Sequence, residues 1–207
     1  MKMTRCAAVL VAPLVLLAAC ADSSDGAEAD ATAAVTAPPT QSTAQPAEIP
    51  TGVVTPEAAT SDPETDLEEG DLAADWLEPV ELTQPVAVND DVTVGIGELL
   101  SRRVEAVLPD EVSGDGVIVP VTVANTGTDD LSLAGFVVTM SAGEGDAPVE
   151  QVVSASDEVP TSIAPGQAMT INAAFVVPQE LRGNVSIVVD LGAQSRAAVF
   201  QGAAPAA

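Results

Sequence analysis

Valine-rich runs recur through the second half of the chain and are separated by short polar stretches. In the clearest run, valine occupies every second position from 117 to 123, and Ile118, Pro120 and Thr122 lie between the valines. Such alternation indicates a strand with one buried face. Similar runs predict strands at 80–88, 92–96, 99–108, 117–124, 131–141, 149–154, 168–176, 185–191 and 197–201. Because the strands are short and no long helical pattern interrupts them, we expect an all-β, antiparallel β-sandwich over 76–207, with its core at about 80–201.

Turn residues separate the predicted strands at regular intervals. Asn125 and Gly127 belong to an Asn-Thr-Gly segment, and we expect them to adopt positive φ in the turn that they form. Pro165 and Gly166 are adjacent, a combination that predicts a tight reversal of the chain.

Aromatic residues are scarce, since the chain has one Trp, three Phe and no Tyr. Each phenylalanine therefore has a large share of the available aromatic surface. We expect Phe136, Phe175 and Phe200 to anchor a core otherwise made of Val, Leu and Ile.

Three segments of this domain, in this order, resemble a known family. They are 119–127 (VPVTVANTG) with Leu131-Ser132-Leu133 and Phe136 after it, 163–167 (IAPGQ), and 174–178 (AFVVP), which ends at Pro178. The set resembles the telokin-like, immunoglobulin-like domain of unknown function found in bacterial lipoproteins of actinobacterial type, and it is similar to a secreted mycobacterial antigen. The resemblance implies an immunoglobulin-like sandwich in an exported protein and no catalytic residues.

The first 19 residues have the pattern of a secretory signal peptide. Lys2 and Arg5 precede an apolar run that is too short to span a membrane. The run ends in Leu-Ala-Ala19-Cys20, which resembles the bacterial lipobox. This resemblance implies cleavage between Ala19 and Cys20, a lipid on Cys20, and anchoring to the outer face of the cell membrane. The alternative is an ordinary signal peptide that is cut near Ala19.

Residues 20–75 are expected to form a disordered acidic spacer. Residues 21–75 contain thirteen Asp or Glu, no basic residue and no aromatic residue, so the segment has little apolar surface to bury. Its span would be on the order of 40 Å as a coil and roughly 180 Å when fully extended. Threonines interleaved with proline in this segment could carry O-linked sugars, as in mucin-like stalks.

The composition excludes most catalytic chemistry. The chain has no histidine, its lysine leaves with the signal peptide, and its two cysteines are Cys6 in the signal and Cys20. Histidine, thiol and amine catalysis and the usual zinc ligands are therefore absent from the mature domain. We expect neither an enzyme nor a cofactor, and no disulfide. Losing Lys2 and Arg5 changes the net charge from −25 to −27, which disfavours nucleic acid as a partner.

Two acidic turns are weak candidates for calcium sites. One contains Asp90 and Asp91, and the other contains Asp110 with Asp115 across a glycine-containing loop. Calcium requires six or more converging oxygens, and neither turn has the carboxylate spacing of a known calcium loop. We therefore expect solvated turn charges and no metal site.

Arg102 and Arg103 form the only basic pair of the mature chain. On a strand the two side chains would point to opposite faces. We expect them to pair with nearby carboxylates such as Glu98 or Glu105, while the alternative is that one of them recognises a partner's carboxylate.

Three classes of function remain. The first is a non-catalytic protein-interaction or scaffold module, held at the membrane by its lipid anchor and engaging another exported protein. The second is a lipoprotein that binds a small ligand or calcium for a transporter or sensor. A carboxylate enzyme is the third and least favoured class. An exposed hydrophobic patch favours the first class, whereas a concave pocket with converging carboxylates favours the second.

Overall fold

A computed structural model of the chain describes residues 41–57, 76–193 and 195–206. The predicted signal peptide, Ala19, Cys20 and most of the predicted spacer lie outside these residues. Their assignments therefore stay predictions.

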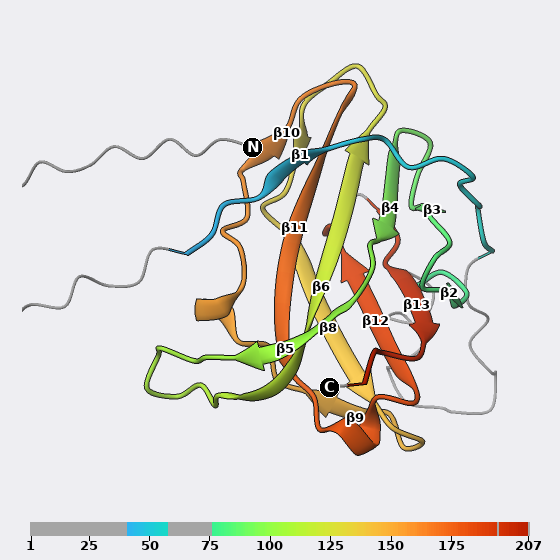
Figure 1. Ribbon diagram of the computed structural model, residues 1–207. Coiled ribbons are helices and arrows are strands. Elements are labelled where there is room, and N and C mark those ends of the chain that lie inside the picture. Colours follow the sequence, from blue (N-terminus) through green and yellow to red (C-terminus); the bar gives the residue numbers. More distant parts are fainter. Residues whose placement is uncertain (1–40, 58–75, 194, 207) are drawn as a thin grey trace, which may run out of the picture. The chain divides into compact units, whose positions relative to one another are not determined.

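The described residues form two main β-sheets (Figure 1). The first contains, in spatial order, β1 (Gln45–Ala47), β11 (Gln167–Val176), β6 (Gly114–Asn125), β4 (Val92–Ile96) and β3 (Val86–Ala87), and β5 (Leu100–Val104) also pairs with β6. The second contains β2 (Val80–Glu81), β13 (Ala198–Gly202), β12 (Val185–Asp190), β8 (Val137–Ala142) and β9 (Ala147–Val149). A small third sheet joins β7 (Leu131–Ser132) to β10 (Ser162–Ile163), and two 3-10 turns, η1 (Val153–Ala155) and η2 (Gln179–Leu181), lie in the loops. All described strand pairs are antiparallel except β2 with β13, which confirms the predicted all-β, antiparallel class.

The two main sheets share one apolar core. The alternating valines of β6 are fully buried on its inner side, and Phe175 of β11 lies in the same core. Ile187 and Phe200 enter it from the second sheet. Phe175 and Phe200 are fully buried, whereas Phe136 is only partly buried at the edge of the core. Two of the three expected aromatic anchors thus lie inside the core.

Strand β6 connects two parts of the first sheet. Its first residues pair with β5 and its last residues pair with β4, while β11 pairs along almost its whole length. Gly97 marks the passage from β4 to β5, and its N–H donates to Pro120 O over 2.8 Å. Strand β6 therefore sets the register of both β4 and β5, which pair with its two halves.

Three predicted strands differ from the observed ones. The run at 80–88 is divided into β2 and β3 by a turn in which Gln84 N–H donates to Glu81 O. The run at 131–141 is divided into β7 and β8 by a similar turn. The run at 149–154 mostly leaves the sheet and forms η1. In each case the apolar pattern continues through a local turn, so hydrophobicity alone did not reveal the break.

The prediction of a disordered spacer at 20–75 was wrong for residues 41–57, which we call the strap. Its β1 pairs with β11, and further on Val54 exchanges backbone hydrogen bonds with the β3 region (Figure 1). Ala44 is buried in the core, and Pro50 lies against Gly95, where a Cβ would be 3.6 Å from Pro50 Cγ. The average composition of the spacer concealed this segment, because only two of the thirteen acidic residues fall within it.

Asn125 and Gly127 do not have the positive φ that we expected. Asn125 is buried, and its Nδ2 donates to Asp129 O at 2.8 Å and to Ile163 O at 2.9 Å. Its Oδ1 accepts from Gly127 N–H, so the side chain organises the turn in place of an unusual backbone angle. Gly127 is tightly placed instead, since a Cβ there would be 3.0 Å from Asp91 Cβ.

The reversal at Pro165 and Gly166 has the expected form. Gly166 has φ +68°, and Gln167 N–H donates to Ala164 O across the turn. Pro178, the end of the third family-like segment, is exposed and precedes η2. These residues shape the ends of β11, which lies between β1 and β6 in the first sheet.

Candidate functional site

Arg182 is the largest fully buried side chain among the described residues. Its guanidinium donates to Val177 O at 3.0 Å, to Ser101 Oγ at 2.7 Å, and to Gly116 O and Pro205 O at 3.2 Å each. A buried cation is tolerated when its donors are satisfied, and these four acceptors come from four separate segments. Arg182 therefore fastens β5, β6, the end of β11 and the C-terminal segment to one another.

Nothing in the sequence predicted this role of Arg182. Arg182 precedes Gly183 and Asn184, a pair that predicts a surface turn, and its acceptors are mostly backbone carbonyls. Carbonyls carry no residue-specific signal, so only the folded arrangement identifies the buried arginine. Gly116 shows how closely the chain packs there, because a Cβ would lie 2.2 Å from Phe175 O.

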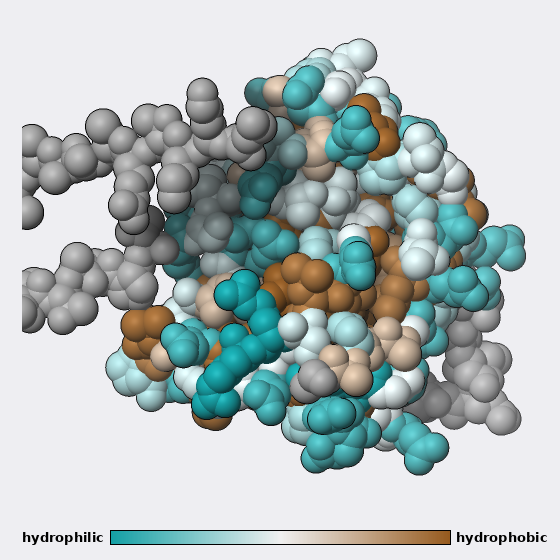
Figure 2. Space-filling model, viewed as in Figure 1, coloured by the Kyte–Doolittle hydropathy of each residue, from teal (hydrophilic) through white to brown (hydrophobic). Residues whose placement is uncertain are grey.

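We call Arg182 and the four segments that it joins the frame. An apolar groove lies beside it. It has a volume of about 540 Å³ and is lined by Leu82, Thr83, Ile96, Gly97, Glu98, Leu99 and residues 203–205. Figure 2 shows hydrophobic residues gathered over this side of the molecule, where the chain passes from β4 to β5. Arg182 holds one wall in place through Pro205 O, and Ala204 N–H donates to Arg182 O at 2.9 Å. The groove is thus concave and mostly apolar, and hydrogen bonds to Arg182 hold one of its walls.

A second apolar region lies on the other side of β5, outside the inter-sheet core. Val104, Ile118, Val152 and Ala174 form a small buried cluster there. Around it, four large side chains of the β5–β6 loop and η1 are at least half exposed: Val107 (52%), Leu108 (50%), Val112 (62%) and Val153 (52%). We call these four residues the η1 patch.

Glu111 holds the η1 patch together. Its Oε1 accepts from Ser154 N–H at 3.0 Å and its Oε2 accepts from Ser154 Oγ, while Ser154 Oγ also accepts from Val107 N–H. Burial raises the pKa of Glu111, but the hydrogen bonds from Ser154 and neighbouring backbone amides together lower it by more, so its pKa lies below the ordinary value. The loop is therefore pinned to η1 by an ionised carboxylate.

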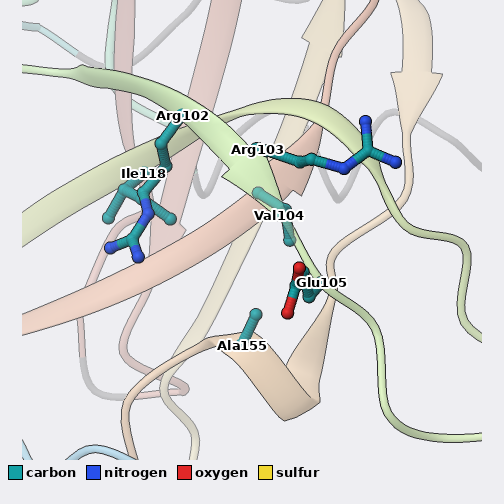
Figure 3. Close-up of a pocket in the computed structure, with 6 residues that line it drawn as sticks. All are labelled: Arg102, Arg103, Val104, Glu105, Ile118 and Ala155. Atoms are coloured by element: carbon teal, nitrogen blue, oxygen red, sulfur yellow. The ribbon is translucent and has the colours of Figure 1, made fainter.

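The two adjacent arginines border the same region. Arg102, Arg103, Val104 and Glu105, with Ile118 and Ala155, line a hollow of about 440 Å³ (Figure 3). Arg103 pairs with a nearby carboxylate, as expected, but its partner is Asp115 on the neighbouring strand at 3.8 Å and not Glu98 or Glu105; both side chains are 67% exposed. The guanidinium of Arg102 makes no hydrogen bond or ion pair with any residue that the structure describes, although its backbone belongs to the β5–β6 ladder. The sequence identified this basic pair but not its partners.

The calcium candidates do not converge. Asp90 and Asp91 line a hollow of about 300 Å³ together with Asp129 and Asp130. Asp110 and Asp115 lie elsewhere, on the β5–β6 loop and on β6. Across residues 41–57, 76–193 and 195–206, no three acidic, histidine or cysteine side chains are grouped so that they could hold a metal ion.

No protein-family model, curated protein or solved structure matches the chain. Within the described ranges, no helix is long and apolar enough to cross a membrane. Inferences about function therefore depend on the geometry of the two apolar regions and on the sequence of the N-terminus.

Proposed function

We propose that the protein is a lipid-anchored, extracytoplasmic binding module without catalytic activity, which engages another exported protein through the apolar groove. The groove itself is the observation that carries this proposal. It places Leu82, Ile96 and Leu99 around an open hollow on an otherwise very acidic protein. Exposed apolar surface of this kind is typical of interaction sites.

The surroundings of the groove indicate what the partner would look like. A short apolar segment fits walls made of leucine, isoleucine and alanine, and Glu98 is the only charged residue in the lining. The strongly negative charge of the chain favours encounter with a partner of neutral or basic surface. Arg182 supports binding indirectly, because a braced wall loses little conformational entropy when a partner is bound.

The sequence supports the location. The lipobox-like Leu-Ala-Ala19-Cys20 segment supports a lipid on Cys20 and a place on the outer face of the cell membrane. The two sheets and their shared core are consistent with the immunoglobulin-like sandwich that the family resemblance implies.

A second candidate is the binding of a small apolar ligand. Pockets for such ligands commonly measure about 300–1,000 Å³ and are mostly apolar, and the groove falls in this range at about 540 Å³. This candidate predicts thermal stabilisation of the purified chain by an apolar compound, and it predicts no protein adduct at the groove.

The test is site-specific photo-crosslinking of the full-length lipoprotein in its own cells. A photoreactive residue at Thr83, which is exposed and lines the groove, is compared with one at Val137, which is exposed on the second sheet. We expect one dominant protein adduct at Thr83, none at Val137, and loss of the adduct in Cys20→Ser. Equal labelling at both positions would contradict the groove as the binding site.

A filled groove provides the complementary variant. Ala203→Phe should place a ring in the hollow and abolish the Thr83 adduct, whereas Ala147→Phe on β9, which is also exposed, should leave the adduct unchanged. An adduct that persists in Ala203→Phe would contradict the proposal.

A further inference from the structure

We infer that the η1 patch is the face with which the domain rests on the lipid bilayer. The inference depends on the lipid anchor at Cys20 that forms part of the proposed function, but not on the apolar groove. It assigns the occupant of a second surface and the orientation of the whole domain at the membrane.

The first observation is that the patch is apolar, exposed and held in place. Figure 2 shows hydrophobic side chains at the tip of the loop between β5 and β6. Val107 and Val153 are brought together because Ser154 bonds both to Val107 N–H and to Glu111. An exposed apolar group that is fixed by an internal hydrogen-bond network can enter the boundary between headgroups and acyl chains without reorganising.

The second observation is the place where the chain leaves the domain toward its anchor. Gln41 Nε2 donates to Val153 O at 2.6 Å, and Glu158 N–H donates to Ser42 O at 2.7 Å. The first described residue of the chain therefore contacts the patch itself, and Figure 1 shows the strap beginning on the same side as η1 and the β5–β6 loop.

The strap also shortens the tether. Twenty residues lie between Cys20 and Gln41, and they can span at most about 70 Å, compared with the roughly 180 Å expected for the whole spacer. A lipid on Cys20 holds the patch close to the bilayer at a high effective concentration, so weak contacts are sufficient to orient the domain.

The charges nearest the patch fit a headgroup layer. Two of the four arginines of the mature chain, Arg102 and Arg103, line the adjacent hollow, and Arg102 has no partner among the described residues (Figure 3). Arginine binds phosphate oxygens through its forked donors. Glu105 and Asp110 lie nearby and oppose a strongly anionic surface, so the fit is to zwitterionic phospholipid, which offers phosphate and ammonium together.

The test measures the depth of a tryptophan at the patch. Lipidated full-length protein carrying Trp76→Phe and Leu108→Trp is reconstituted in phosphatidylcholine vesicles, with or without bromine on the acyl chains. We expect tryptophan emission to fall about twofold with brominated lipid, because the side chain reaches the acyl boundary. The matched variant has Val137→Trp, at a position that is 51% exposed on the second sheet, and its emission should not change.

Vesicle flotation is measured in the same samples and distinguishes the lipid anchor at Cys20 from the contact between the η1 patch and the bilayer. A protein that fails to float would overturn the lipid anchor, and this inference with it. A protein that floats but shows equal emission in both lipids would overturn the inference and leave the anchor standing. Val112→Trp, at a position that is 62% exposed, repeats the measurement independently in case Leu108→Trp disturbs the loop.

A protein occupant is the competing outcome. A photoreactive residue at Leu108 in native membranes should give lipid adducts. A single protein adduct at that position would overturn the bilayer as the occupant of the patch.

Discussion

The frame around Arg182 and the region of the η1 patch both place arginine beside apolar residues. The arginine of the frame is buried and hydrogen-bonded, whereas those beside the patch are exposed. In the frame, Arg182 is 2% exposed and donates to four acceptors from four segments. At the patch, Arg103 is 67% exposed with one distant carboxylate, and Arg102 has no described partner. The same residue type thus joins segments of the fold in one region, whereas in the other its guanidinium is exposed and can contact another molecule.

The apolar residues differ in the same way. Phe175 and the β6 valines lie in the core, whereas Leu108 and Val112 remain at least half exposed on a loop that hydrogen bonds hold in position. Burial gives the first group a role in stability. The second group adds little to stability, so its exposed side chains are available for the bilayer contact that we infer.

Phe175→Ala should cause the largest loss of stability. The ring is fully buried between the sheets, so its removal leaves a cavity and should lower the free energy of unfolding by about 3–5 kcal/mol. Chemical denaturation measures the change. Phe136→Ala, which removes a partly buried ring, is the matched control and should cost clearly less; equal losses would contradict the difference in burial between the two rings.

Arg182→Met tests the frame directly. The substitution keeps an unbranched apolar stem but removes the hydrogen bonds that Arg182 donates to buried acceptors such as Val177 O and Gly116 O, and we expect a loss of about 2–4 kcal/mol. Arg103→Met makes the same change at an exposed site and should alter stability by no more than about 0.5 kcal/mol. Similar values for both variants would remove the contrast between the two arginine environments.

Ala44→Asp tests whether the strap belongs to the domain. A carboxylate at this buried position should detach the strap at a cost of about 1–2 kcal/mol, less than a core substitution because the strap has only three ladder pairs with β11. Limited proteolysis should then cut within residues 41–57. Gln45→Asp adds the same charge at the exposed neighbouring position and should leave the strap resistant; early cleavage in both variants would point to strand propensity as the cause.

The strap also shows what a sequence can and cannot predict. The alternating valines of β6 predicted that strand well, because a period of two has one structural meaning over eight residues. The strap has no such period, and its order comes from contacts with Gly95 and the edge of β11, which lie far away in the sequence. A composition average over 21–75 could not reveal contacts of this kind.

The candidate site was predictable only in part. The adjacent Arg102 and Arg103 were visible as the sole basic pair of the mature chain, but the partner of Arg103, Asp115, was not. The burial of Arg182 and the pinning of the loop by Glu111 were not visible, because both depend on partners more than 40 residues away or on backbone atoms. Residue types indicate chemistry, whereas the availability of that chemistry is decided by the fold.

Glu111→Gln should have the smallest effect on stability and the most local one. Because the folded pKa lies below the ordinary value of 4.5, the ionised carboxylate contributes stability that is present above that value and is lost as the pH falls through the folded pKa. The substitution should therefore cost less than about 1 kcal/mol at neutral pH, and the difference from the wild type should shrink in acid. The amide resonance of Ser154, followed by NMR, should titrate with the carboxylate in the wild type and not in the variant. If it titrates in both proteins, another group pins the loop, and the order of the η1 patch needs a different cause. If the wild-type titration occurs as expected, the patch that we infer to face the bilayer should loosen as the surrounding medium becomes acidic.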